Sequence, residues 1–163
     1  MRSGTFPSKV ACLPVLLGKA ETPSFRTGPY PGPSQYPVIK RLGIKTVINL
    51  LDQFPDSYKV YLDALDVRYV HVPVKGNKQS PEDMSRTAAN QVLKLLIEPT
   101  LQPVLLHCRS GKHRTGAIIG CLRRLQGLSA EAAADEYRQF ATPKQREVDE
   151  IFIQRFDPGL CLA

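Results

Sequence analysis

The segment from Val104 to Gly116 constrains the fold of this 163-residue chain more than any other part of the sequence. Val104–His107 has the composition of a short buried strand, a polar loop begins at Cys108, and a helical stretch runs from Arg114 to Gln126. In an open α/β sheet, a loop that leads from the carboxyl end of a strand into a helix points its backbone N–H groups at one place and can bind an anion there. The segment therefore predicts an α/β fold with an anion site in this loop.

The loop also carries a nucleophile and several cations. Five residues separate Cys108 from Arg114, so the loop can curl until the sulfur lies beneath a bound phosphate and the guanidinium grips two of its oxygens. Arg109, Lys112 and His113 add positive charge around the sulfur. Because N–H dipoles and cations favour the thiolate form of a cysteine, we expect Cys108 to attack phosphorus at neutral pH.

The other residues of the loop have supporting roles in this interpretation. Arg109, Ser110, Gly111, Lys112 and His113 are the predicted phosphate-binding residues, and Gly111 permits the tight turn that the loop needs. Thr115 places a hydroxyl beside the sulfur, where it could stabilise the thiolate that leaves in a second step. We expect His107 to orient the loop without transferring protons.

The remaining elements follow from periodicity, caps and breakers. Residues 22–37 are rich in proline and predict an extended lead-in without regular structure. The predicted elements are a helix over 38–42, a strand over 46–50, a helix over 57–65, a strand over 68–74, a helix from Ser80 to Pro99, and helices over 114–126, 129–140 and from 142 onward. Strands that alternate with helices predict a mainly parallel central sheet flanked by helices.

The length suits one domain with one core, which we place at residues 22–157, with an N-terminal extension over 1–21 and a C-terminal tail over 158–163. The apolar stretch Val10–Leu17 is short and broken by Pro14, which favours a ragged end leading into an edge strand. A cleaved signal peptide ending near Ala20 is the alternative. No apolar run approaches the ~20 residues that a membrane span needs.

The net charge indicates what kind of partner the chain binds, and the cysteines indicate the compartment in which it folds. Lys and Arg number 22 against 15 acidic residues, and this net charge of +7 indicates an anionic partner. The few aromatic residues are not interleaved with the basic ones, so we expect no nucleic-acid partner. The four cysteines show neither CxxC pairs nor metal-ligand spacing with the three histidines. They are interpreted as free thiols of a reducing compartment, with the cytoplasm as the expected location and the nucleus as the alternative.

The run His-Cys-x-x-Gly-x-x-Arg-Thr-Gly, from His107 to Gly116, resembles the signature loop of the protein tyrosine phosphatase superfamily. Its form Gly111–Gly116 resembles a narrower group, the plant and fungal atypical dual-specificity phosphatases, whose members include inositol pyrophosphate phosphatases. The resemblance extends over roughly residues 22–157 and includes Phe25–Gly28, Gly76–Lys78, Cys121–Gln126 and Asp135–Ala141. It implies a cysteine-dependent phosphatase fold and two-step hydrolysis through a thiophosphate on Cys108, without metal or cofactor.

The position at which the family pattern predicts a general acid carries no acidic residue in this chain. Larger relatives of this group carry an aspartate just after the strand that here ends at Val74, but Lys75 and Gly76 occupy that place. Asp83 is the candidate acid, although it also stands at the capping-box position after Ser80. A phosphoanhydride leaving group is itself a phosphate and needs less protonation than an alkoxide or a phenolate. A weak acid position therefore favours a pyrophosphate substrate.

Basic residues outside the loop point to the same substrate class. We expect Asn77, Lys78 and Lys144 to bind substrate, and Lys75 and Arg146 could also reach the edge of the site. Each cation alone could be an ordinary surface charge, but together they indicate a ligand with many phosphates. The leading hypothesis is hydrolysis of inositol pyrophosphates. A dual-specificity protein phosphatase acting on phosphoproteins and a non-catalytic phosphate-binding module are the alternatives.

Overall fold

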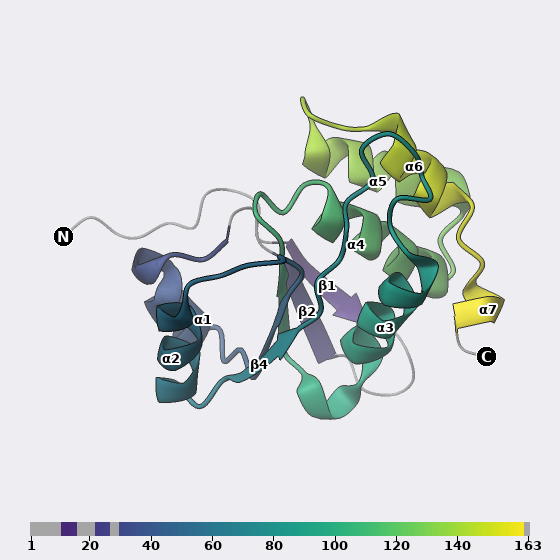
Figure 1. The fold of residues 1–163 in the computed structure, drawn as a ribbon. Coiled ribbons are helices and arrows are strands. Elements are labelled where there is room, and N and C mark those ends of the chain that lie inside the picture. Colours follow the sequence, from purple (N-terminus) through teal and green to yellow (C-terminus); the bar gives the residue numbers. More distant parts are fainter. Residues whose placement is uncertain (1–10, 16–21, 27–29, 162–163) are drawn as a thin grey trace.

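The computed structural model describes residues 11–15, 22–26 and 30–161, with side chains from residue 30 onward. Its centre is a five-stranded sheet in the order β1-β2-β5-β3-β4 (Figure 1). The strands are β1 (Ala11–Val15), β2 (Thr22–Arg26), β3 (Thr46–Asn49), β4 (Arg68–His71) and β5 (Val104–His107). The β1–β2 pair is antiparallel and the other pairs are parallel, so the predicted mainly parallel sheet is confirmed.

The register brings the carboxyl ends of three strands to one edge of the sheet. Asn49, the last residue of β3, pairs with His107 of β5 on one side and with His71 of β4 on the other. The chain segments that follow these strands therefore start side by side, which is where parallel sheets bind ligands.

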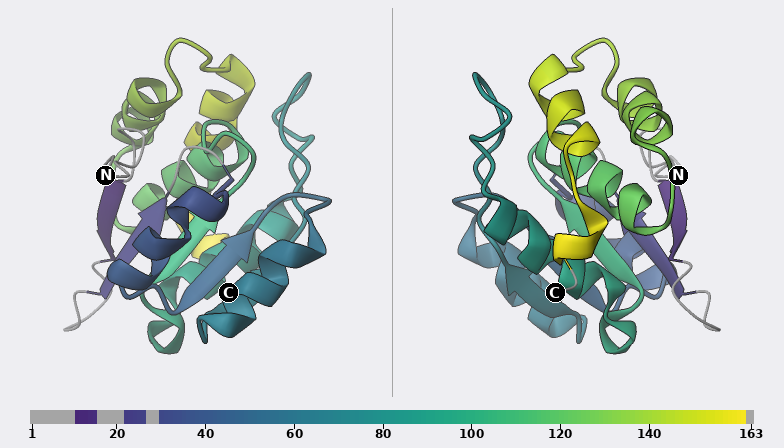
Figure 2. Two further views of the ribbon diagram at one scale, coloured as in Figure 1. Left: turned by 90° about the vertical axis from the view of Figure 1, so that its left-hand side faces the viewer. Right: turned by 90° about the vertical axis from the view of Figure 1, so that its right-hand side faces the viewer.

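Helices cover both faces of the sheet. Figures 1 and 2 show α1 (Tyr36–Arg41) and α2 (Asp56–Ala64) on one side, and α3 (Arg86–Ile97), α4 (Arg114–Leu125) and α6 (Glu147–Gln154) on the other. Side chains alternate along a strand, so Val47 and Leu105 pack with the first layer whereas Ile48 and Leu106 pack with the second. Both faces of β3 and β5 are buried, which explains why two adjacent apolar residues lie at the centre of β3 and three apolar residues follow one another in β5.

The outer elements extend the second layer. α5 (Ala130–Ala141) packs against α4 and α6, and Ser129 caps it by accepting a hydrogen bond from the amide of Ala132, as its sequence predicts. Two short 3₁₀ helices, Pro33–Gln35 and Pro99–Leu101, connect elements. A short helix, α7 (Pro158–Cys161), lies within the predicted C-terminal tail and buries Cys161. Within the described ranges, no helix combines the length and apolar character needed to cross a membrane.

The prediction that residues 22–37 lack regular structure is wrong. Thr22–Arg26 forms β2, which lies between β1 and β5, and helix α1 already begins at Tyr36. β2 pairs with β5 only through Phe25 and Arg26, beyond Pro23, so the proline does not interrupt that ladder. Hydrogen bonding to the neighbouring strands β1 and β5 therefore outweighs the local preference of the prolines for irregular structure. The predicted edge strand in the N-terminal extension is present as β1.

Two predicted helix starts are also wrong. α3 begins at Arg86 instead of Ser80, and its cap is Ser85, whose hydroxyl accepts a hydrogen bond from the amide of Ala88. The last long helix begins at Glu147 instead of 142. β4 ends at His71, although the amides of Val72 and Val74 continue the hydrogen bonding toward β3. At both predicted starts, Ser80 and Thr142, a hydroxyl residue of a loop resembles a helix N-cap, and the helix itself begins several residues later.

Candidate active site

The loop between β5 and α4 curls around the sulfur of Cys108. Cys108 is buried, with 3% of its surface exposed, and its Sγ accepts a hydrogen bond of 3.2 Å from the backbone N–H of Gly111. Gly111 has a φ of 70°, in the left-handed region that favours glycine, and this conformation turns the amide back toward the sulfur. This hydrogen bond fixes the position of the sulfur within the loop.

Arg114, the first residue of α4, is held by two backbone carbonyls from the segments that follow β3 and β4. Its Nη1 donates to the carbonyl of Leu50, after β3, at 3.4 Å and to the carbonyl of Val74, after β4, at 3.3 Å. Gly76 lies against the same side chain, and a Cβ at that position would be 3.2 Å from Arg114 Cγ. Gly76 therefore leaves room for the arginine, a role that its position after a strand does not reveal in the sequence.

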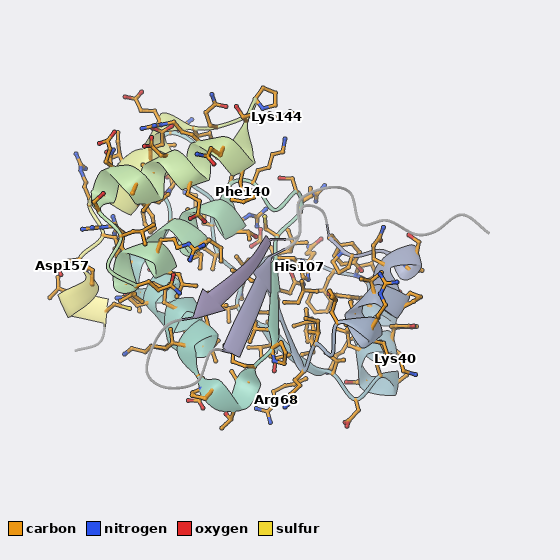
Figure 3. All side chains as sticks on the ribbon, turned by 180° about the vertical axis from the view of Figure 1, so that it is seen from behind. Lys40, Arg68, His107, Phe140, Lys144 and Asp157 are labelled. Atoms are coloured by element: carbon orange, nitrogen blue, oxygen red, sulfur yellow. The ribbon has the colours of Figure 1, made fainter. Side chains whose placement is uncertain are left out.

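His107 supports the loop from below. The ring is fully buried, and Figure 3 shows it near the middle of the molecule, between the helices on the two sides of the sheet. Burial lowers its pKa to about 4, so the ring is neutral at physiological pH. Nδ1 contacts the carbonyl of Cys108 at 3.2 Å and must donate to it, so Nε2 accepts from the hydroxyl of Tyr58 at 2.9 Å. These bonds fix the ring and the start of the loop.

A pocket of about 200 Å³ opens above the sulfur. It is lined by Gly76, Lys78, Cys108, Arg109, Ser110, His113, Arg114 and Arg146. Four of these residues are lysine or arginine, so the pocket attracts anions. The loop after β4 and the start of α6 thus contribute cations to a site whose floor comes from the β5–α4 loop.

His113 attaches the turn before α6 to the catalytic loop. Its Nε2 donates to the carbonyl of Lys144 at 2.7 Å. Arg146, which caps α6, donates from Nη1 to the carbonyl of Asn77 at 3.0 Å, and this bond holds its side chain beside the pocket. The side chains of Lys112 and Lys144 lie outside the pocket lining, so neither contacts this pocket directly.

Behind the pocket, a buried carboxylate joins three segments. Asp149 of α6 is fully buried and accepts hydrogen bonds from Asn77 Nδ2 at 3.2 Å and from the Tyr137 hydroxyl at 2.7 Å. Burial raises the pKa of this carboxyl above its ordinary value. Asn77 Oδ1 in turn accepts from the amide of Met84. Asn77 therefore braces the loop after β4 from inside, which differs from the predicted contact with substrate.

Asp83 lies in a setting that disfavours proton donation. Its Oδ2 accepts hydrogen bonds from the backbone amides of Lys78, Gln79 and Ser80, and its Oδ1 contacts Lys75 Nζ at 3.2 Å. These donors hold the pKa of the carboxyl well below its usual range, so it is ionised whenever the protein is near neutral pH. Asp83 shapes the loop after β4 and lines neither pocket that contains Arg114.

Thr115 is fully buried at the start of α4, and its Oγ1 makes no hydrogen bond within the described part of the chain. Cys108, Cys121 and Cys161 are free thiols. In the region that the structure describes, no group of three or more His, Cys, Asp or Glu residues is arranged to hold a metal ion. The residues that line the pocket at Cys108 instead provide a thiol and several cations.

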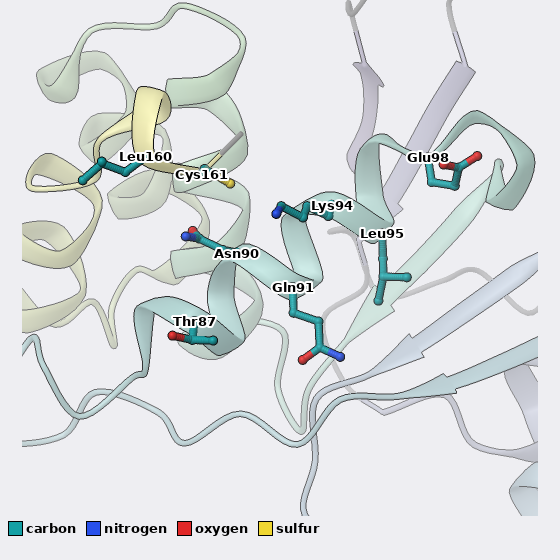
Figure 4. A pocket seen from close by; sticks show the side chains of 8 residues that line it. All are labelled: Thr87, Asn90, Gln91, Lys94, Leu95, Glu98, Leu160 and Cys161. Carbon is teal, nitrogen blue, oxygen red and sulfur yellow. The ribbon is translucent and has the colours of Figure 1, made fainter. Parts of the chain in front are cut away.

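One further pocket adjoins the Cys108 loop, and another lies apart from it. One, of about 230 Å³, is lined by Leu51, Asp52, Gln53, Arg109 and Arg114 and so shares both arginines with the catalytic pocket. The other, of about 630 Å³, lies between α3 and α7 and shares no lining residue with the Cys108 loop (Figure 4). The two pockets that share Arg109 and Arg114 are therefore the candidate active site.

Comparison with known proteins agrees with this geometry. A model of the tyrosine phosphatase family matches residues 14–162. The chain is 36% identical over 119 residues to inositol diphosphatase SIW14 of Saccharomyces cerevisiae, covering 72% of this chain and 42% of that protein. It is 31% identical over 134 residues to inositol diphosphatase DSP3 of Arabidopsis thaliana, covering 82% and 66% of the two chains. The chain therefore spans less than two thirds of the length of either relative.

Solved structures show the same fold. The core catalytic domain of the PP-IP phosphatase SIW14 superposes with a TM-score of 0.75 at 32% identity, covering 82% of this chain and 80% of that one. TpbA of P. aeruginosa superposes with a TM-score of 0.68 at 22% identity, covering 85% and 83%.

Proposed function

Because the chain belongs to the tyrosine phosphatase family, we propose that it hydrolyses phosphate groups with Cys108 as the nucleophile and without a metal ion. The observation that carries the proposal is the position of Cys108 in a cationic pocket where one of the three arginines, Arg114, is fixed by two backbone carbonyls. A binding module has no need for a nucleophile in this position.

In the first step, the Cys108 thiolate attacks phosphorus while the backbone amides of the loop and Arg114 hold the phosphate oxygens. The Sγ–P bond forms as the bond to the leaving oxygen breaks. In the second step, water attacks the thiophosphate and releases inorganic phosphate and the thiolate. The amide of Gly111, already 3.2 Å from Sγ, stabilises the departing sulfur. We expect the buried Thr115 hydroxyl, which makes no hydrogen bond within the described residues, to be a second donor for it.

For the substrate, we favour inositol pyrophosphates. Lys78, Arg109 and Arg146 line the pocket in addition to Arg114, which is more positive charge than one phosphate monoester requires. The names of the relatives SIW14 and DSP3, both inositol diphosphatases, support the same class. The fixed, ionised Asp83 is also compatible with a leaving group that needs little protonation.

A protein phosphatase is the second candidate. The chain is 32% identical over 149 residues to the putative tyrosine-protein phosphatase OCA1 of Mycosarcoma maydis, covering 90% of this chain and 94% of that protein. Phosphate release measured over inositol pyrophosphates, phosphotyrosine and phosphoserine peptides, and polyphosphate distinguishes the candidates. We expect the highest kcat/KM on an inositol pyrophosphate, and a clear preference for phosphopeptides would favour the second candidate instead.

The nucleophile is tested by Cys108→Ser. This variant is expected to lose turnover on every substrate while it still binds phosphate, because the loop amides and Arg114 remain in place. Phosphate release and binding of inorganic phosphate by calorimetry measure the two properties separately. Substantial residual hydrolysis would overturn the covalent mechanism, whereas a thiophosphate trapped on Cys108 of the wild-type protein after acid quench would support it.

A further inference from the structure

The second pocket beside Arg114 contains a carboxyl group that the mechanism above does not use. Asp52 lies in the segment that follows β3, two residues after Leu50, whose carbonyl accepts a hydrogen bond from Arg114. Its side chain is exposed and lines the 230 Å³ pocket together with Arg109 and Arg114. Because these arginines also line the pocket that contains Cys108, Asp52 lines a pocket adjacent to the proposed phosphate site.

The carboxyl groups of the other acidic candidates, Asp83 and Glu82, take part in other interactions. Asp83 is fixed by three backbone amides and Lys75. Glu82 accepts a hydrogen bond from the Ser80 hydroxyl and forms an ion pair of 3.1 Å with Arg155. Among the described residues that line the two pockets containing Arg114, Asp52 is the one that carries a carboxyl group.

We propose that Asp52 is the general acid and base of the reaction, acting from the pocket that receives the leaving group. This inference rests on the proposed phosphatase function. Cys108 lines the first pocket and Asp52 the second, with Arg109 and Arg114 common to both. A phosphate that contacts both arginines would lie between the two pockets, so its leaving group would extend from the side of Cys108 toward the pocket that Asp52 lines.

Asp52 donates the proton that the leaving group takes and later accepts the proton that the attacking water releases. In the first step the Sγ–P bond forms, the bond from phosphorus to the leaving oxygen breaks, and that oxygen takes the proton of the Asp52 carboxyl group. In the second step the Asp52 carboxylate takes a proton from the attacking water, the new P–O bond forms, and the P–Sγ bond breaks. Each turnover consumes one water and returns both Cys108 and Asp52 to their initial states.

Dependence on the leaving group tests this role. A nitrophenolate leaves readily without a proton, whereas a phenolate benefits from one, so p-nitrophenyl phosphate and phenyl phosphate form a matched pair. Asp52→Asn is expected to lower kcat/KM on phenyl phosphate by about 10²-fold or more, within the usual range for general-acid catalysis, and to change it on p-nitrophenyl phosphate only a few-fold. A change of charge or of packing alone would affect both esters alike.

The control is Asp56→Asn, which makes the same chemical change at an exposed position of the same connection, in the first turn of α2 and outside both pockets. It is expected to leave both kcat/KM values near those of the wild type. Thermal unfolding of each variant confirms that it folds.

Equal losses on the two esters, or no loss, in Asp52→Asn would overturn the role of Asp52. A wild-type protein that cleaves the nitrophenyl ester but not the phenyl ester would also overturn it, because such an enzyme has no working acid. Failure of the proposed function has a different result, namely full activity of Cys108→Ser or no phosphate release by the wild type from the two esters, from phosphopeptides or from inositol pyrophosphates.

Discussion

At the scale of single residues, the side chain of Arg114, which we propose binds phosphate, depends on backbone from elsewhere in the chain. The carbonyls of Leu50 and Val74 accept its Nη1, and Gly76 packs against its aliphatic part. None of these three residues belongs to the loop that contains Cys108. The position of the guanidinium is therefore a property of three neighbouring strand ends and not of the loop alone.

Gly76→Ala tests this dependence. The new Cβ would lie 3.2 Å from Arg114 Cγ, so the arginine must shift by a few tenths of an ångström. Because small displacements of catalytic groups are costly, we expect kcat/KM to fall by about tenfold while stability changes little. Steady-state kinetics and thermal unfolding measure the two effects. Gly159→Ala, in α7, serves as the control, and wild-type kcat/KM in Gly76→Ala would refute the positioning role.

At the scale of elements, glycines let the helices of the second layer approach one another. A Cβ at Gly116 of α4 would lie 2.9 Å from the ring of Tyr137 in α5, and one at Gly120 would lie 2.4 Å from Ile153 Cδ1 in α6. The close packing brings α5 and α6 to the N-terminal end of α4, where Tyr137 and Asp149 form their hydrogen bond. Helix packing thus sets where Arg146 meets the pocket.

Gly120→Ala is expected to destabilise the protein by about 1–3 kcal/mol, the usual cost of overpacking, even though alanine favours a helix more than glycine does. Urea unfolding measures the change in the free energy of unfolding. The double variant Gly120→Ala/Ile153→Val removes the methyl group that the new Cβ meets and should recover part of the loss. Strict additivity of the two substitutions would contradict the contact between them.

At the scale of the whole molecule, the layers of the fold bury a titratable group beneath the active site. His107 ends the central strand β5 and is enclosed by both layers, with Tyr58 of α2 as its hydrogen-bond partner. Its pKa in the folded protein is about 4, below the ordinary value of 6.5. The unfolded chain therefore binds a proton at this site at a higher pH than the folded protein does.

The stability of the fold should consequently fall as the pH drops from 6.5 toward 4. Above pH 6.5 both states carry a neutral ring, so the full stability is present there, and the loss between the two pKa values amounts to about 3 kcal/mol. Urea unfolding at a series of pH values measures this slope. His107→Gln is expected to flatten the slope and His113→Gln to preserve it, and an unchanged slope in His107→Gln would argue against this account.

The local part of the site could be predicted from the sequence by itself. The strand–loop–helix context, the spacing from Cys108 to Arg114 and the turn at Gly111 all lie within one short segment, where the bonded geometry of the chain limits what can form. The same holds for β3 and α5, whose apolar periodicity and caps are local signals. These features are encoded by neighbours along the chain, so reading them requires no knowledge of the fold.

Only the tertiary structure decided the features that depend on distant segments. Residues 22–26 form a strand because β1 and β5 provide hydrogen-bond partners, and Arg114 is held by carbonyls that follow β3 and β4. Arg146 reaches the pocket through its bond to Asn77, and Asp52 lies beside Arg114 because β3 and β5 are neighbours in the sheet. Such contacts join residues that are far apart in sequence, and local propensity and spacing carry no information about them.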